Sequence, residues 1–168
     1  MAENATTKKV DIGSGKKISG WITCDANPRA KVDVISSLPP VPDVFKDTDV
    51  FRLIHVLEHF YRWDAVTLLG QFHDFLTPGG QLVLELPNLN SAIDALSGKS
   101  GQSKRRWGMW VLYGDPSHKN PLYGHRWGWT PETLTAELEA AGFRRIIRER
   151  PKFHVPDRDF RLVAFKDK

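Results

Sequence analysis

The chain has almost no cysteine and no long apolar segment. Cys24 is its only cysteine, so no disulfide can form within the chain, which is typical of a protein from a reducing compartment. No apolar run approaches the roughly 18 residues of a membrane-spanning helix, and residues 1–9 lack the apolar core of a secretory signal. We therefore expect a cytoplasmic protein that has no membrane partner.

The chain also lacks a strong excess of charge of one sign. It contains 24 Lys and Arg residues against 20 Asp and Glu residues, a net charge of +4, with a pI of about 9.3. This bias is weaker than that of a dedicated nucleic-acid-binding protein. The length of 168 residues and the hydrophobic content of 40% match one ordinary globular domain. We expect residues 1–168 to form a single domain that is a monomer or a dimer.

Short apolar segments that end at polar residues predict an α/β fold. The strand pattern covers residues 9–12, 21–25, 32–35, 50–54 and 81–86. The apolar spacing over 63–76 predicts an amphipathic helix, which Thr77-Pro78-Gly79-Gly80 would end. Such alternation favours a mostly parallel sheet with helices on both faces.

The last part of the chain predicts one more helix and a hairpin. Thr130 is a suitable N-cap for a helix that begins at Pro131 and stops at Gly142. Strands over 143–149 and 160–165 are joined by a short linker, so we expect them to pair as an antiparallel hairpin.

The most informative motif is Asp11-Ile12-Gly13-Ser14-Gly15, a strand end that opens into a glycine loop. The two glycines let a nucleotide-like ligand approach the backbone. Position 18 is Ile18, and the Walker spacing that ends in Lys-Ser/Thr is missing, so neither common phosphate-binding motif is present. A carboxylate at Asp11 would repel a phosphate, whereas it could hold a cationic amino group.

Polar residues follow the predicted parallel strands. Ligands of open α/β sheets bind at the carboxyl ends of the strands, so we expect these residues to share one rim: Asp11, Asp25, Ser36, His55 and Pro87-Asn88. The carboxylate of Asp25 suits the two hydroxyls of a ribose.

The order of motifs along the chain carries a family resemblance. The glycine motif is followed by Gly20-Trp21 and Asp25, by His55-Val56-Leu57-Glu58-His59, by the stretch from Leu76 to Leu84, and by Ala140-Ala141-Gly142-Phe143. This order resembles the class I S-adenosylmethionine-dependent methyltransferases, most closely their small type 11 branch, over roughly the whole chain. The resemblance implies a Rossmann-like seven-stranded sheet, mostly parallel with an antiparallel C-terminal hairpin and with helices on both faces. It also implies S-adenosyl-L-methionine as the cofactor.

The same resemblance implies which residues bind that cofactor. The methionine end would be surrounded by Asp11, Ile12, Gly13, Ser14 and Gly15. The ribose or adenine would lie beside Asp25, Ala26 and Asn27, and the sulfonium would face His55, Val56 and Leu57. Relatives carry an Asp-Leu pair after the third strand, whereas this chain has Ser36-Ser37-Leu38. The adenine would then be held by Ser36 and Leu38, by a backbone carbonyl, or by a shifted Asp33.

The spacing His55-x-x-Glu58-His59 also matches the inverted zinc-peptidase signature. That signature lies well inside a helix and needs a further ligand downstream, whereas this one begins at a strand end, so we reject the peptidase interpretation. A looser cation site on Glu58 and His59 stays open, as does a structural role in which Glu58 caps the next helix. We assign no metal ligand from the sequence.

Residues 98–130 should distinguish this chain from its relatives, because substrate selection resides in loops above a shared sheet. We expect a substrate-side insertion or lid, with substrate contacts from Glu58, Trp107, Tyr123 and Trp127. The candidate catalytic residues are His125 and His59, with His118 as an alternative general base for a hydroxyl nucleophile. The tryptophans could instead form a satellite core under a long insertion.

Basic residues gather at the start of this segment: Lys99, Lys104, Arg105 and Arg106. They suit an acidic or carbohydrate-type small molecule first, and a single-stranded nucleic acid second. The sequence therefore favours methyl transfer to an oxygen, with nitrogen as second choice, of a small substrate. The alternatives are a non-catalytic SAM-binding or partner-recognition module and a nucleic-acid methyltransferase.

Overall fold

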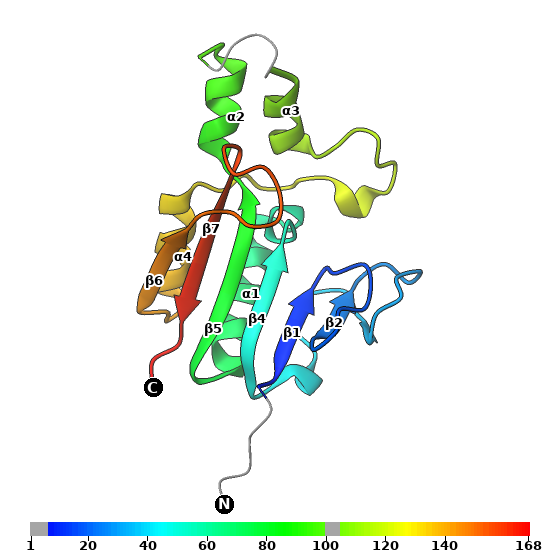
Figure 1. The fold of residues 1–168 in the computed structure, drawn as a ribbon, viewed down its shortest axis with the longest axis vertical. Helices are drawn as coiled ribbons and strands as arrows, with labels where there is room; N and C mark the ends of the chain where they lie inside the picture. The colour runs from blue at the N-terminus through cyan, green and yellow to red at the C-terminus, as the bar shows by residue number, and fades with distance from the viewer. Residues whose placement is uncertain (1–6, 100–104) are drawn as a thin grey trace, which may run out of the picture.

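A computed structural model describes residues 7–99 and 105–168, so the extreme N-terminus and part of the basic run, Lys104 included, lie outside the described residues. The chain forms one sheet in the order β3-β2-β1-β4-β5-β7-β6 (Figure 1). Its strands are β1 (Lys9–Ile12), β2 (Ile22–Asp25), β3 (Val34–Ile35), β4 (Thr48–Ile54), β5 (Leu76–Pro87), β6 (Arg145–Glu149) and β7 (Asp159–Phe165).

The pairing of the strands confirms the predicted sheet. Strands β3, β2, β1, β4 and β5 pair in parallel, whereas β7 pairs antiparallel with both β5 and β6. The hairpin of β6 and β7 is therefore the predicted antiparallel one. The bounds of β1 agree with the sequence pattern, and β2 and β3 are shorter than predicted at their N-terminal ends.

Strand β5 differs from the prediction because it begins directly after helix α1 (Arg62–Phe75). Leu76 already pairs with Thr48, and the register then shifts so that Gln81 pairs with Val50. The segment 77–80 thus forms an irregularity within the strand instead of a turn before it. Thr77 holds this irregularity in place, because its Oγ1 donates a hydrogen bond to Asp49 Oδ1 at 2.9 Å.

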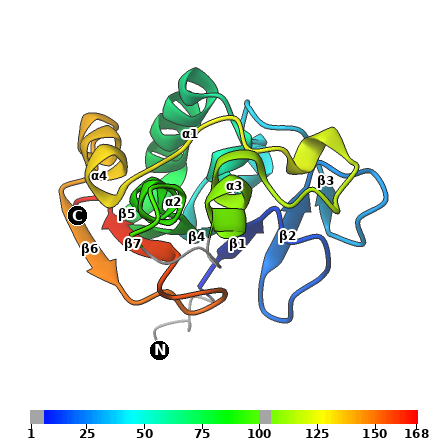
Figure 2. The same ribbon diagram turned by 90° about the horizontal axis from the view of Figure 1, so that it is seen from above.

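Helices α1 and α4 (Pro131–Ala140) lie on one face of the sheet (Figure 2), and the hydrophobic core lies between them and the sheet. Side chains alternate along a strand, and every second residue of the long strands belongs to the core. These residues are Val10, Ile12, Phe51, Leu53, Leu82, Leu84, Leu86, Phe160, Leu162 and Ala164, and they pack on Ala65, Leu68, Leu69 and Phe72 of α1 and on Leu134 and Leu138 of α4.

The opposite face differs from the expectation of helices on both faces. In the described part of the chain, the loop between β6 and β7 crosses this face, and the two helices that pack on the sheet both lie on the other side (Figures 1 and 2). The connections 13–21 and 26–33 are shorter than the dozen or so residues that a helical crossover needs. This face carries a charged pair: Arg52 pairs with Asp11, and the Cζ of Arg52 lies 4.0 Å from the ring centroid of Trp21.

Two further helices, α2 (Leu89–Leu96) and α3 (Arg105–Tyr113), pack together beyond the carboxyl ends of the strands (Figure 1). Gly108 permits their close approach, because a Cβ at this position would lie 2.7 Å from Leu96 Cγ and 3.0 Å from the carbonyl oxygen of Ala92. The sequence analysis predicts neither helix. Among the described residues, no helix is long and apolar enough to cross a membrane.

The one-sided core predicts unequal losses from two adjacent isoleucines of β6. Ile146 packs against the core, whereas Ile147 faces the other way and is 42% exposed. We expect Ile146→Ala to lower the free energy of unfolding by about 2 kcal/mol and Ile147→Ala by less than about 1 kcal/mol. Urea unfolding of both variants measures the difference, and equal losses would contradict a core confined to one face.

Candidate functional site

A cavity of about 320 Å³ opens at the carboxyl ends of β1, β2 and β4. We call it the first cavity. It brings together most of the residues that the resemblance assigned to cofactor binding: Ile12, Gly13, Asp25, Ala26, Asn27, Ser36, Leu38, His55 and Val56. The sequence analysis did not assign Phe60, Asp64, Leu122 and Arg126 to this site, although they also line it.

The wall of the first cavity depends on Gly13. Its φ is +73°, its amide donates to the carbonyl oxygen of Cys24 at 2.7 Å, and a Cβ here would lie 2.4 Å from Val56 Cγ2. Only glycine combines this backbone conformation with so close an approach. Gly15 has a φ of +65°, but a Cβ there would meet open space.

Asp25 organises the loops around the first cavity. Its Oδ2 accepts a hydrogen bond from the amide of Gly15 and its Oδ1 accepts one from the amide of Asn27, both at 2.8 Å. Each carboxylate oxygen has a second lone pair, so the side chain can still accept hydrogen bonds from a ligand in the cavity.

The structure places Asp33 away from the first cavity. Its Oδ2 accepts hydrogen bonds from the amide and hydroxyl of Thr23, at 3.0 and 2.7 Å, and its Oδ1 lies 2.8 Å from Lys17 Nζ. Ser36 and Leu38 line the cavity instead. Of the adenine contacts left open by the sequence, the geometry favours those from the 36–38 segment.

A second cavity of about 300 Å³ adjoins the first and shares His55, His59 and Tyr123 with it. Its other walls come from distant parts of the chain: Glu58, Pro87, Trp110, Val111, Asp115, His118, His125, His154 and Arg158. His154 and Arg158 belong to the loop before β7. The sequence does not predict them, because nothing in a strand pattern shows which loop at the carboxyl ends of the strands folds back over the sheet.

His55 stands at the junction of the two cavities. It has a φ of +54°, which is uncommon for a residue with a side chain. Its Nε2 lies 2.9 Å from Asp159 Oδ2 and its Nδ1 lies 3.4 Å from Glu58 Oε1. Burial raises the pKa of Asp159, but hydrogen bonds from His55 and Arg158 outweigh it and hold that pKa below its usual range.

Glu58, His59 and His125 meet in the second cavity. Burial raises the pKa of Glu58 to about 7 and lowers the pKa of His59 to about 4. Burial also lowers the pKa of His125. Each of these residues offers one ligand atom, and the ligand atoms lie within 4.8 Å of one another. The three residues could therefore bind a metal ion together.

The peptidase motif takes a form unlike that of a zinc peptidase. Leu57–His59 is a short 3₁₀ turn after β4, and His55 is bonded to Asp159 instead of joining the ligand group. This geometry agrees with the rejection of the peptidase interpretation.

Some predicted cofactor residues lie outside the first cavity. Asp11 points to the opposite face of the sheet, where it pairs with Arg52, and Leu57 is buried in the core. Ser14 and Gly15 do not line the cavity either, although Gly15 supports its wall through Asp25. The alternation of side chains along β1 could have predicted the position of Asp11. Val10 and Ile12 face the core, so Asp11 must face away from it.

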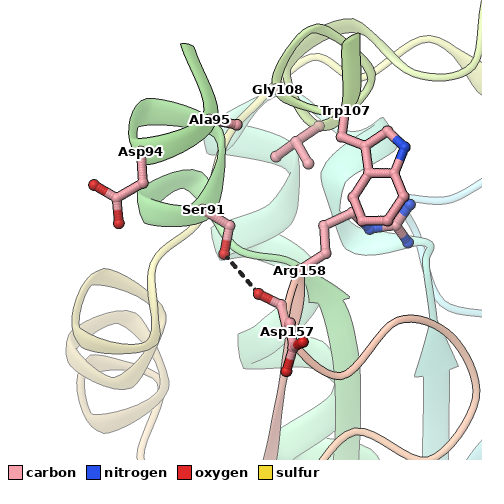
Figure 3. Close-up of a pocket in the computed structure, with 8 residues that line it drawn as sticks. Ser91, Asp94, Ala95, Trp107, Gly108, Asp157 and Arg158 are labelled. Atoms are coloured by element: carbon pink, nitrogen blue, oxygen red, sulfur yellow. Dashed lines mark hydrogen bonds between the residues drawn. The ribbon is translucent and has the colours of Figure 1, made fainter. Parts of the chain in front are cut away.

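The predicted substrate residues lie in three different places. Glu58 and Tyr123 line the second cavity. Trp107 lines a separate pocket of about 110 Å³ between α2, α3 and the loop before β7, where Ser91 Oγ donates a hydrogen bond to Asp157 O at 3.4 Å (Figure 3). Trp127 is 43% exposed and packs edge-on against Trp129, which belongs to the main core.

The two loop glycines predict different responses to a methyl group. Gly13→Ala and Gly15→Ala both place a side chain at positive φ, which costs about 1–2 kcal/mol. Only Gly13→Ala also meets Val56, so we expect it to lose about 1–3 kcal/mol more. Thermal unfolding followed by circular dichroism compares the two, and a Gly15→Ala variant as unstable as Gly13→Ala would contradict the close approach.

Comparisons with known proteins agree with this geometry. Residues 9–147 match the family model described as a methyltransferase domain, and no curated protein gives a significant match. A SAM-dependent methyltransferase from Archaeoglobus fulgidus has a TM-score of 0.64 and 20% identity, over 96% of this chain and 87% of that one. A SAM-dependent methyltransferase from Thermotoga maritima has a TM-score of 0.60 and 15% identity, over 95% and 82%.

The SAM-dependent methyltransferase SibL has a TM-score of 0.59 and 15% identity, over 98% of this chain but only 51% of that longer chain. At these identities the solved structures show a common fold alone. The match to the family model shows in addition that the chain is a member of that family, since the match spans most of the chain. The chain belongs to the methyltransferase-domain family and is a SAM-dependent methyltransferase, with S-adenosyl-L-methionine as its cofactor.

Proposed function

We propose that the enzyme methylates an oxygen, with nitrogen as second choice, of a small acidic or carbohydrate-type molecule held in the second cavity. The observation that carries this proposal is the meeting of the two cavities at His55, His59 and Tyr123. In the proposed reaction the bond between sulfur and methyl carbon would break with its electrons staying on sulfur, a bond from the acceptor oxygen to that carbon would form, and the hydroxyl proton would pass to His125 or His59.

The first cavity fits the cofactor. Its volume falls in the range of small-molecule sites, about 300–1,000 Å³. Gly13 leaves the backbone open to close approach, Asp25 offers free lone pairs to the ribose hydroxyls, and Ser36 with Leu38 borders the adenine side. When bound, S-adenosyl-L-methionine supplies a methyl group that a cationic sulfur has already activated. The residues of this chain then mainly align the partners and exclude water.

The second cavity suits a polar acceptor. Trp110 and Tyr123 offer aromatic faces, while Asp115, His118 and Arg158 offer charged or polar groups to hydroxyls and carboxylates. Residues 98–130, so far as they are described, supply several of these groups from above the sheet (Figure 1). We propose this segment as the substrate-side lid.

His125 and His59 are the proposed proton-handling residues. Both lie in the second cavity, and His59 also borders the first. An imidazole at this junction can take the proton of the acceptor hydroxyl as the new bond forms. Alignment supplies the larger share of the rate, so no catalytic triad is needed.

The first prediction from this proposal concerns cofactor affinity. Asp25→Asn removes the charge from the hydrogen bonds to the ribose, so we expect affinity for S-adenosyl-L-methionine to fall about 10- to 100-fold. Asp33→Asn is the matched control, since Asp33 lies outside the first cavity. Isothermal calorimetry measures both. Unchanged affinity for Asp25→Asn would contradict the assignment of the first cavity to the cofactor. An equal loss of affinity for Asp33→Asn would indicate that Asp33 contacts the adenine.

The second prediction concerns turnover. Incubation with methyl-labelled cofactor and a fractionated cell extract should label a small molecule. With that acceptor, we expect His125→Ala to lower the rate about 100-fold while the affinity for S-adenosyl-L-methionine stays the same. Label in oligonucleotides would favour the nucleic-acid alternative, and cofactor binding without any transfer would favour a non-catalytic module.

A further inference from the structure

Glu58 carries a buried carboxylate that receives no hydrogen bond from the described residues. The residue is 2% exposed, and neither of its side-chain oxygens has a hydrogen-bond partner among the described residues. One imidazole approaches it: the Nδ1 of His55 lies 3.4 Å from Glu58 Oε1, and the Nε2 of His55 is already bonded to Asp159. A buried carboxylate without hydrogen bonds is costly unless something else compensates it.

Two imidazoles face this carboxylate with their orientation already set. The Nδ1 of His59 lies 3.2 Å from the carbonyl oxygen of Gly124, and the Nδ1 of His125 lies 2.8 Å from that of Val111. A carbonyl oxygen only accepts, so each Nδ1 must donate its proton and each Nε2 keeps a lone pair. Backbone carbonyls hold the rings of metal-binding histidines in the same way.

The backbone keeps the three side chains together. The amide of Arg126 donates to the carbonyl oxygen of Glu58 at 2.8 Å, and Arg126 Nη1 donates to the carbonyl oxygen of His59 at 2.8 Å. The residue next to His125 is therefore fixed to the turn that carries Glu58 and His59. The group is assembled by the fold and does not depend on a chance approach of surface side chains.

We propose that Glu58, His59 and His125 bind a divalent transition-metal ion of the Zn²⁺ type. Two imidazoles and one carboxylate form a common catalytic zinc site, whereas Mg²⁺ prefers oxygen ligands. The ligand atoms lie within 4.8 Å of one another, and they would close to about 3.3 Å around an ion with bonds of about 2.0 Å. Among the described residues, Glu58 has no hydrogen bond that this movement would break.

The remaining coordination position would face the second cavity, because all three ligands line it. An acceptor hydroxyl bound there would lose its proton to solvent more readily. With their Nε2 lone pairs on the ion, His59 and His125 would act through it instead of taking the proton themselves. Whether the ion binds does not depend on methyl transfer, whereas its use on the acceptor rests on the proposed function.

The test is a titration of the chelator-treated protein with Co²⁺ and with Zn²⁺. We expect one ion per chain, a visible Co²⁺ spectrum of low coordination number, and no comparable binding of Mg²⁺. Glu58→Gln and His125→Ala should each weaken Zn²⁺ binding at least tenfold. His118→Ala is the matched control, since His118 lines the same cavity but lies outside the ligand group, and it should bind Zn²⁺ like the wild type.

Circular dichroism melting shows whether each variant is folded, and Glu58→Gln preserves the shape of the side chain should His125→Ala fail to fold. Absence of stoichiometric binding, or equal binding by wild type and Glu58→Gln, would overturn the metal site. Calorimetry with S-adenosyl-L-methionine on the same samples separates the two proposals. Metal binding without methyl transfer would overturn only the proposed function, and methyl transfer without metal binding would overturn only the metal site.

Discussion

The functional half of the molecule depends on the attachment of one backbone segment to one turn. The amides of Arg126 and Trp127 both reach the carbonyl oxygen of Glu58, at 2.8 and 3.3 Å. This attachment joins the segment after α3 to the turn after β4. It acts together with the contact of His59 Nδ1 with the carbonyl oxygen of Gly124, at 3.2 Å, and these bonds hold Tyr123 and His125 beside His59. The alignment that methyl transfer requires therefore rests in part on main-chain hydrogen bonds, which do not depend on the identity of the side chains.

The one-sided core sets a second constraint. With short connections between β1, β2 and β3, no helix of the described residues covers the far face of the sheet, and charged residues on this face pair with one another. Asp11 pairs with Arg52, whose guanidinium is also stacked on Trp21. The acidic residue of the glycine motif thus supports the strand from which the loop leaves, while Gly13 forms the cavity wall. Farther along, Glu85 accepts hydrogen bonds from the amides of Lys152 and Phe153, both at 2.8 Å, and so anchors the loop that brings His154 and Arg158 to the acceptor side.

The donor side could be predicted from the sequence to a large extent, because it is local. Gly13, Asp25, Ser36 and His55 each follow a strand, and the carboxyl ends of parallel strands meet at one rim. The errors also have local causes. Asp11 was assigned to the cofactor on its place in the motif, although strand alternation turns it away. The 77–80 segment contains strong turn residues, but the pairing of Leu76 with Thr48 overrides them.

The acceptor side could not be predicted in the same way, because its walls meet only through tertiary contacts. Trp110 comes from a helix whose packing depends on Gly108 against Ala92, and Arg158 comes from a loop that folds back over the sheet. Neither contact leaves a periodic pattern in the chain. This difference also explains why the cofactor can be predicted from the sequence and the acceptor cannot. The site for a common cofactor needs backbone geometry that glycine and strand ends encode locally, whereas the acceptor is selected by side chains whose meeting point is set by the whole fold.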